Sequence, residues 1–201
     1  MTFWSSNTLE PKRQFKFLFT IPGLGGNGTF ESYLIKQVNK PQFTLGETAV
    51  NYIQHTFKYP GRLTWTDVSI TLIDTVRVDD TSSRLANILR SSGYVIPDTD
   101  QNARYSFTKQ GATNALNSPL IQQIDAGVLG NDPNAHTPRV VDEWVLRNAW
   151  MKTANFGSLA YNSDELVDVT MGIAYDWAEY RTLEDGNTSE ISMTGLQLLG
   201  S

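Results

Sequence analysis

A glycine-rich segment is the first place where the sequence suggests chemistry. Residues 23–28 read GLGGNG and match the G-x-G-x-x-G pattern of dinucleotide-binding loops, whose glycines let the backbone approach a pyrophosphate. Such a site also needs a helix that begins at the last glycine. Here Pro22 precedes the glycines, the Asn27-Gly28 pair is typical of a turn, and residues 29–38 lack a helical apolar stripe. The segment therefore predicts a loop and not a nucleotide site.

Histidine, cysteine and serine show no catalytic or metal-binding pattern. The chain has no Cys and only two His, His55 and His136, neither of which has a spaced His or carboxylate partner. No G-x-S-x-G elbow occurs, although sequence alone leaves a Ser-His-Asp triad open. We therefore expect no catalytic residue, no cofactor and no metal.

Carboxylates gather at four places, and a glycosidase needs two carboxylates across a cleft. In a chain with 21 acidic residues, such groups are expected as strand ends, helix caps and surface charge. They do not by themselves predict an enzyme. The groups are Asp79/Asp80, Asp142/Glu143, Asp164/Glu165/Asp168 and Asp176/Glu179.

The composition is that of one folded domain. The chain has 201 residues, 40% of them hydrophobic and 18% charged, and a net charge of -5. Disordered chains are less hydrophobic and more charged, and an acidic chain is a poor electrostatic partner for DNA or an anionic membrane. No apolar run approaches the roughly 20 residues of a membrane span, and residues 1–11 lack a signal-peptide core. These features predict a soluble protein of a reducing compartment without a membrane anchor.

Alternating apolar residues predict the elements that would position any site. Residues 15–21 form one such strand, with Phe15, Phe17, Phe19 and Ile21 on one face. A second alternation covers residues 167–177 and predicts one long strand with a buried face. Further strands are expected at residues 64–73, where the apolar phase changes between Trp65 and Val68 and suggests a bulge or a residue facing another surface, and at 33–38, 52–59, 120–124 and 139–148.

Residues 81–92 form the clearest predicted helix. Asp79, Asp80 and Thr81 supply capping side chains at its start, Leu85, Ile88 and Leu89 form an apolar stripe, and Gly93 stands where a helix often ends. A second helical stretch is expected around residues 113–117. Many strands with few helices predict a mainly β protein, an antiparallel β-sandwich or partly open barrel with one flanking α-helix.

The aromatic content raises the question of assembly. The chain has 5 Trp and 9 Phe, and lysine or proline does not systematically block its two clearest strands. Exposed strand edges are either blunted or used to assemble, so sheet-edge assembly and purely internal strands both stay open. We expect residues 182–201 to be a tail that is disordered unless a partner orders it.

Several segments, in order, resemble the tail tube proteins of contractile-tailed bacteriophages (myoviruses), over about residues 3–180. Each segment is moderately specific, and their order and spacing make the match. The segments are FWSS at 3–6, EPKRQFKF at 10–17, KQVNKP at 36–41, FKYPGRLTW at 57–65, VSITLID at 68–74, YNSDELV at 161–167 and IAYDWAEY at 173–180.

The resemblance implies a structural virion protein rather than an enzyme. Tube proteins of this family form hexameric rings in which each subunit lends strands to a continuous inner barrel. The rings stack into a hollow tube inside a contractile sheath, and the tube penetrates the host envelope and conducts double-stranded DNA. The implied partners are other copies of the chain and the tail sheath, baseplate and tail terminator proteins, in a virion assembled in the host cytoplasm. The type VI secretion tube shares this architecture.

The same resemblance divides the chain into an arm (1–14), a β domain (15–180) and a tail (181–201). We expect intersubunit contacts from the arm and from an extended hairpin at about 40–60, whose loss should leave rings that do not stack. Polar faces of the strands near the C-terminus could line the lumen or face solvent. The candidate contact residues are Phe3, Trp4, Pro11, Phe43, Phe57 and Tyr59, and the candidate lumen or solvent residues are Asp168, Thr170 and Asp176.

Two classes of alternative stay open at this point. Within the tube class, the chain could be a type VI secretion-like or baseplate tube protein. From a different class, a β-sandwich carbohydrate-binding module or hydrolase would share the fold. That alternative predicts a monomer with an aromatic or paired-carboxylate cleft.

Overall fold

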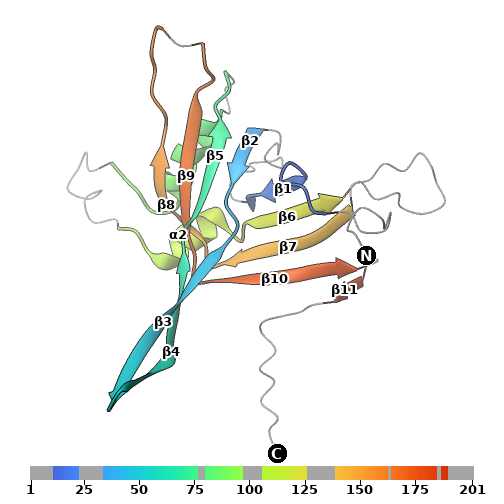
Figure 1. The fold of residues 1–201 in the computed structure, drawn as a ribbon. Helices are drawn as coiled ribbons and strands as arrows, with labels where there is room; N and C mark the ends of the chain where they lie inside the picture. Colours follow the sequence, from blue (N-terminus) through green and yellow to red (C-terminus); the bar gives the residue numbers. More distant parts are fainter. Residues whose placement is uncertain are drawn as a thin grey trace, which may run out of the picture.

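The computed structural model describes residues 11–22, 34–76, 80–96, 106–125, 139–162, 164–184 and 187–189. Within these ranges the chain forms eleven strands and two helices, arranged as two antiparallel sheets and a projecting two-stranded hairpin (Figure 1). The fold class is therefore mainly β, consistent with the predicted β-sandwich with flanking helix. The predicted residues 23–28 loop, His136 and most of the N-terminal arm lie outside the described residues.

The five-stranded sheet has the order β1-β6-β7-β10-β11, and all neighbours are antiparallel. The strands predicted at residues 120–124 and 139–148 are confirmed as β6 and β7. β10 and β11 extend into the segment predicted as the tail. The bounds are β1 Phe17–Thr20, β6 Leu120–Asp125, β7 Arg139–Arg147, β10 Trp177–Glu184 and β11 Asn187–Ser189.

The four-stranded sheet has the order β2-β5-β9-β8, again antiparallel throughout. Its strands are rich in Val, Ile and Thr, which pack well on a pleated, half-buried surface. The bounds are β2 Ile35–Val38, β5 Val68–Ile73, β9 Asp168–Ala174 and β8 Trp150–Asn155. The hairpin consists of β3 (Gln42–Tyr52) and β4 (His55–Thr66), which pair only with each other.

Both helices begin with a side-chain cap, and the cap of the first is the one predicted from the sequence. The Asp80 carboxylate accepts a 2.7 Å hydrogen bond from the Ser83 N–H at the start of α1 (Thr81–Ser91). Gly93 after α1 has φ 107°, a conformation that glycine adopts without strain. The second helix, α2 (Lys109–Leu116), begins four residues earlier than the expected stretch because Thr108 caps it through a hydrogen bond from the Gly111 N–H.

The core lies between the two sheets and is closed on one side by the helices. Leu85 and Ile88 of α1 pack into it, as the stripe predicts, whereas Leu89 of the same stripe is 37% exposed. Alternate residues of β5 and β9 are 0–1% exposed, so the two central strands of the four-stranded sheet are covered on one face. These strand residues are Val68, Ile70, Leu72, Val169, Met171 and Ile173.

Four details of the strand predictions are wrong. The strand predicted at 52–59 contains the tip of the hairpin, since β3 ends at Tyr52 and β4 begins at His55. Phe15 precedes β1 and is 73% exposed instead of sharing the buried face of Phe19. The strand predicted at 167–177 is two strands, since the chain turns at Asp176, whose N–H bonds to the Arg147 carbonyl, and β10 joins the other sheet. The strand predicted at 64–73 is also two strands, since β4 ends at Thr66 and β5 begins at Val68. Asp67, the single residue between them, marks the phase change that suggested a bulge or a residue facing another surface.

Candidate assembly surfaces

The β3–β4 hairpin projects away from the two sheets and exposes both its faces (Figure 1). Every residue of β3, and every residue of β4 except Trp65, is exposed. A two-stranded ribbon that makes no other sheet contact is only marginally stable in water. A projecting, exposed ribbon of this length is therefore a candidate surface for a partner and not a part of the core.

Apolar side chains gather in two patches on opposite faces of this hairpin. Near its base, cross-strand pairs put four apolar residues on one face, which we name the proximal patch: Phe43, Leu45, Leu63 and Trp65. Beyond Gly46, four apolar residues lie on the other face, and we name them the distal patch: Val50, Tyr52, Phe57 and Tyr59. The distal side chains are 49–66% exposed. Contiguous exposed apolar surface of this kind marks interaction sites.

The change of face follows from the sequence of β3 and from a bulge in β4. Strand residues alternate between faces, and the apolar positions change from odd (Phe43, Leu45) to even (Val50, Tyr52) along β3. The register shifts between Leu45 and Glu47, so one extra β4 residue is accommodated there. On the face opposite the distal patch, Lys58 and Glu47 form an ion pair at 2.9 Å, which keeps that face polar.

The base of the hairpin is fixed to the domain by aromatic contacts. The rings of Phe43 and Trp65 meet edge to face with centroids 5.5 Å apart, and Trp65 lies 5.9 Å from Tyr175. The Tyr175 hydroxyl donates a 2.9 Å hydrogen bond to the Thr66 carbonyl. Burial raises the pKa of Tyr175 to about 12, so this donor stays protonated at physiological pH. The base is therefore anchored, while the distal patch is left free.

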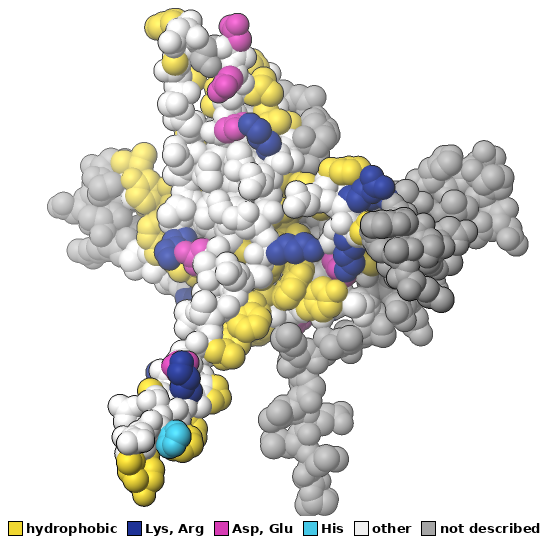
Figure 2. All heavy atoms as spheres, in the orientation of Figure 1, with side chains coloured by type: hydrophobic (Ala, Val, Ile, Leu, Met, Phe, Trp, Pro, Cys, Tyr) yellow, Lys and Arg dark blue, Asp and Glu magenta, His cyan; other side chains and the backbone are white. Residues whose placement is uncertain are grey.

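The free face of the four-stranded sheet is polar but almost uncharged. Pairing places serine, threonine, glycine and amide side chains side by side across all four strands, with Ile73 at one end. They are Gln37, Ser69, Thr71, Thr153, Asn155, Thr170 and Gly172. Figure 2 shows this face as a broad white area between two pairs of opposite charges. Two ion pairs border the face, Lys36–Asp168 at 2.6 Å and Lys152–Asp67 at 2.7 Å. Within each pair the two opposite charges neutralise each other.

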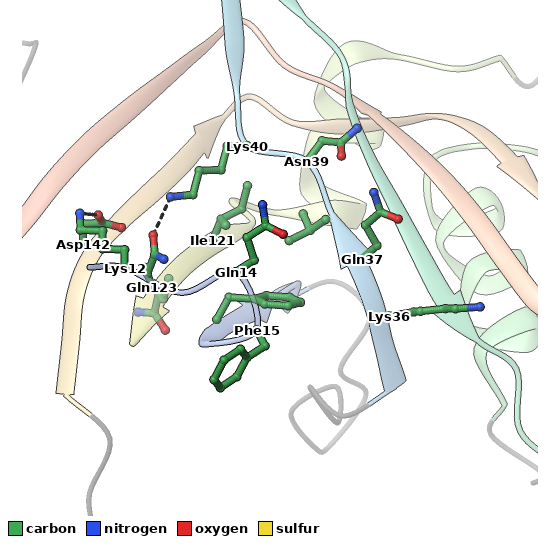
Figure 3. A pocket seen from close by; sticks show the side chains of 13 residues that line it. Lys12, Gln14, Phe15, Lys36, Gln37, Asn39, Lys40, Ile121, Gln123 and Asp142 are labelled. Atoms are coloured by element: carbon green, nitrogen blue, oxygen red, sulfur yellow. Dashed lines mark hydrogen bonds and ion pairs between the residues drawn. The ribbon is translucent and has the colours of Figure 1, made fainter. Parts of the chain in front are cut away.

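A groove opens at the β2 side of the domain, between β2, residues 12–17 and the five-stranded sheet (Figure 3). Its volume is about 970 Å³. Four side chains give it an apolar floor, and three lysines stand around it. The apolar residues are Phe15, Phe17, Val38 and Ile121, and the lysines are Lys12, Lys36 and Lys40.

Two of these lysines point toward the five-stranded sheet (Figure 3). Lys40 donates a 2.6 Å hydrogen bond to the Gln123 side chain, and Lys12 donates to the carboxylate of Asp142. Asp142 is 2% exposed and also accepts from the Tyr180 hydroxyl at 3.3 Å. The bond to Asp142 raises the pKa of Lys12, because the carboxylate favours the ammonium form. Residues 12–17 are thus held to the sheet by a largely buried charge.

The contact residues that the sequence predicts lie in different places in the structure. Phe43 belongs to the proximal patch, whereas Phe57 and Tyr59 belong to the distal patch. Pro11 is exposed at the start of the described residues, and Phe3 and Trp4 lie outside them. The hairpin expected at about 40–60 extends over residues 42–66.

The three candidate lumen or solvent residues do not share one face. Thr170 and Asp168 lie on the free face of the four-stranded sheet. Asp176 lies at the β9–β10 turn, where Lys109 and Asn148 donate hydrogen bonds of 2.6 and 2.7 Å to it. The bond from Lys109, and then that from Asn148, lowers the pKa of Asp176. Strand alternation predicts that Asp168, Thr170 and Asp176 share one face. The turn at Asp176 ends this alternation, so Asp176 does not lie on that face.

Sequence reasoning missed most of the two hairpin patches. Leu45, Leu63 and Tyr52 were recognisable only as apolar strand residues, and their exposure depends on the absence of a third strand. Among the described residues, no group of three or more His, Cys, Asp or Glu side chains is placed to hold a metal ion. No helix in the described ranges is long and apolar enough to cross a membrane.

Comparisons by sequence find no relative: no protein-family model matches, and no similar curated protein is found. Comparison of the fold finds chains from contractile injection systems. A chain of the PVC sheath–tube complex in the extended state has a TM-score of 0.56 and 12% identity, over 89% of this chain and 99% of that one. A chain of the PVC sheath/tube terminator gives 0.57 and 12%, over 86% and 97%.

A third match comes from the baseplate of the anti-feeding prophage, in a structure with six-fold symmetry. It has a TM-score of 0.56 and 11% identity, over 86% of this chain and 96% of that chain. The matches include almost the whole of each neighbour, so they concern the complete domain and not one motif. The chain therefore has the fold of proteins found in the sheath–tube, tube-terminator and baseplate assemblies of contractile injection systems.

Proposed function

We propose that this chain is a tube subunit of a contractile tail or injection system. Copies join head to tail into rings, the rings stack, and the hollow tube forms the inside of a contractile sheath. The observation that carries the proposal is the four-stranded sheet, whose two edge strands run in opposite directions. The match to a chain of a sheath–tube complex over 99% of that chain supports it.

The direction of the edges decides which sheet can close a barrel. In the four-stranded sheet β2 and β8 are antiparallel, so placing β2 of one subunit beside β8 of the next continues the antiparallel pattern. Repetition of this heterologous contact closes a ring when its rotation allows. The five-stranded sheet has an odd number of strands, so its edges β1 and β11 run in the same direction and would meet as a parallel pair.

In this arrangement the free face of the four-stranded sheet lines the channel. Its other face is buried under the rest of the subunit, so the body of each subunit lies outside the barrel. Thr170 and the Asp168–Lys36 pair then belong to the channel wall, and Asp176 does not. A wall of hydroxyl and amide groups has little attraction for a polyanion, which would otherwise be held by basic side chains.

The resemblance to phage tail tubes favours a virion protein that conducts double-stranded DNA, with sheath, baseplate and terminator proteins as partners. The hairpin supplies the contact between successive rings. A tube of an extracellular injection system, a baseplate tube or a type VI secretion-like tube would use the same ring. In each of these roles the chain acts by assembly and catalyses no reaction.

Negative-stain electron microscopy of the purified protein, together with its mass by light scattering, tests the proposal. We expect hexameric rings or hollow tubes. A chain that stays monomeric at all concentrations and also binds a glycan would overturn the proposal in favour of a carbohydrate-binding module. If rings or tubes form, purification of the chain with its sheath from a phage or from an injection particle would distinguish the phage role from the injection-system role.

A further inference from the structure

An apolar corner lies at the β8 side of the domain, where α1 and α2 meet. Five apolar side chains there are 37–68% exposed, and the rings of Tyr94 and Phe107 stack with centroids 6.2 Å apart. We name these five residues the helical corner: Leu89, Tyr94, Val95, Ile96 and Phe107. Next to it, Trp150 and Met151 of β8 help to line a pocket of about 590 Å³. Exposed apolar side chains gathered in this way mark a candidate interaction site.

The groove described above lies at the opposite edge of the same sheet. Phe15 is 73% exposed there, although it follows the arm and precedes a buried strand. Phe17, Val38 and Ile121 extend the apolar floor toward the core. The two layers of the sandwich are thus filled by helices at the β8 edge and open at the β2 edge.

We propose that the helical corner of each subunit occupies the groove of the next subunit. The inference rests on the proposed ring and adds to it a second, side-chain contact. The helical corner lies beside β8, and the groove lies beside β2. Both lie on the core side of the four-stranded sheet, because each is lined by residues that contact the buried layer. Joining β8 to the next β2 therefore brings the helical corner over the groove.

The chemistry of the two surfaces supports a second copy as the occupant. An apolar corner meets an apolar floor, and a groove of about 970 Å³ has room for several large side chains. Lys12 and Lys40 hold their ammonium groups on Asp142 and Gln123 of the five-stranded sheet, so their aliphatic stems can lie along the inserted rings. The contact is heterologous, since corner and groove differ, and it is continuous with the strand junction.

Cysteine cross-linking tests this contact directly, because the chain has no Cys of its own. In the double variant Phe107→Cys/Val38→Cys, a short bis-maleimide should give a ladder of oligomers that ends at the closed ring. Neither single variant should form a ladder, because a head-to-tail contact brings two different surfaces together. A dimer from Phe107→Cys alone would show an isologous contact and overturn the proposal. The double variant Phe107→Cys/Ser69→Cys is the control, since Ser69 lies on the free face.

A second pair separates this inference from the ring itself. Gln37→Cys/Thr153→Cys places one thiol on each edge strand of the four-stranded sheet and reports only the strand junction. If this pair forms the ladder and Phe107→Cys/Val38→Cys does not, the helical corner contact is wrong and the ring stands. If neither pair forms a ladder, the proposed function fails as well.

Polar substitution in the helical corner gives an independent measurement. Leu89→Ser/Phe107→Ser should raise the protein concentration needed for ring formation by about tenfold or more, as expected for a central apolar contact. Tyr161→Ser is the matched control, because Tyr161 is a fully exposed aromatic residue distant from both surfaces in the chain. Equal assembly of the double variant and the wild type would exclude the contact.

Discussion

Gly61 lies so close to Gly46 across the hairpin that a Cβ at residue 61 would stand 3.0 Å from the carbonyl carbon and oxygen of Gly46. A contact of 3.0 Å is tighter than nine in ten real Cβ contacts, so the neighbouring backbone would have to give way by a few tenths of an ångström. The pair stands where the register of the hairpin shifts and where the apolar side chains change face. The bulge therefore favours glycine at residue 61, and the bulge positions the distal patch.

Gly61→Ala should disturb the hairpin without unfolding the domain. The added methyl group must displace backbone, at a local cost of about 1–3 kcal/mol, while the core residues lie elsewhere. We expect an unchanged melting temperature, altered cross-strand NMR contacts at Leu45 and Glu47, and loss of tube growth. Gly46→Ala is the matched control, because its Cβ would meet its nearest neighbours at an ordinary 3.5 Å. Identical tubes from both variants would contradict the role of Gly61.

The distal patch should be needed for stacking but not for folding. Val50→Ser/Phe57→Ser/Tyr59→Ser removes apolar surface that is already exposed in the subunit, so its free energy of unfolding should change little. Electron microscopy should show rings without long tubes, as for deletion of residues 40–60. Ala49→Ser/Thr56→Ser, on the opposite polar face, should stack normally. Long tubes from the triple variant would assign stacking to another surface.

The ion pair between Lys12 and Asp142 should stabilise the domain measurably. Asp142 is buried, and among the described residues its Oδ1 has no hydrogen-bond partner, so removal of Lys12 leaves the carboxylate only the Tyr180 hydroxyl. Because Lys12 is half exposed, Lys12→Met should cost about 2 kcal/mol, between typical exposed and buried pairs.

Urea unfolding of Lys12→Met, Asp142→Asn and the double variant measures this coupling. The double variant should lose less than the sum of the single variants. Since the pKa of Lys12 is raised from 10.5, its contribution is complete below that value and is lost as the pH rises through the folded pKa. Additive losses in the two single variants would show that the pair contributes nothing.

Glu179 should contribute to the loss of stability in acid. A 2.7 Å hydrogen bond from Arg147 lowers the pKa of Glu179 below 4.5, and Trp177 and Arg181 act in the same direction. A carboxylate with a lowered folded pKa stabilises the protein above its unfolded pKa, and this stability is lost as the pH falls through the folded value. Glu179→Gln should therefore weaken the pH dependence of urea unfolding below about pH 4.5. Glu47→Gln, in the hairpin, serves as the control and should leave that dependence unchanged.

Local patterns predicted the covered side of the fold well. Val169, Met171 and Ile173 are fully buried, as the alternation requires. Asp80 stands at the start of α1 and Gly93 just after its end, as their residue types predict. These features depend on neighbouring residues alone, which is why sequence reasoning reaches them. The path of the chain between the two sheets does not depend on neighbouring residues alone. The turn at Asp176 and the junction at Asp67 were therefore missed.

The assembly surfaces were harder to predict, because exposure is a property of the whole arrangement. Phe15 and Phe19 have the same parity in the sequence, yet Phe15 is 73% exposed and Phe19 1%. Nothing in the local pattern distinguishes these two residues. They differ because Phe15 lies in the groove at the β2 side of the domain, whereas Phe19 lies in the core. The candidates Phe43, Phe57 and Tyr59 were found as aromatic residues of a resembling segment, while their division between two faces needed the register.

The isolation of the β3–β4 ribbon has a kinetic consequence. A ribbon that pairs only with itself opens at low free energy, so its amides should exchange rapidly in the free subunit. In the proposed tube each new ring would order these strands, and every addition would include a small folding step. The first ring has no ring below it to order its ribbons. It would therefore lose the conformational entropy of these strands without a template. Spontaneous nucleation would then be slow and growth on an existing end fast, which confines tube formation to the place where assembly is started.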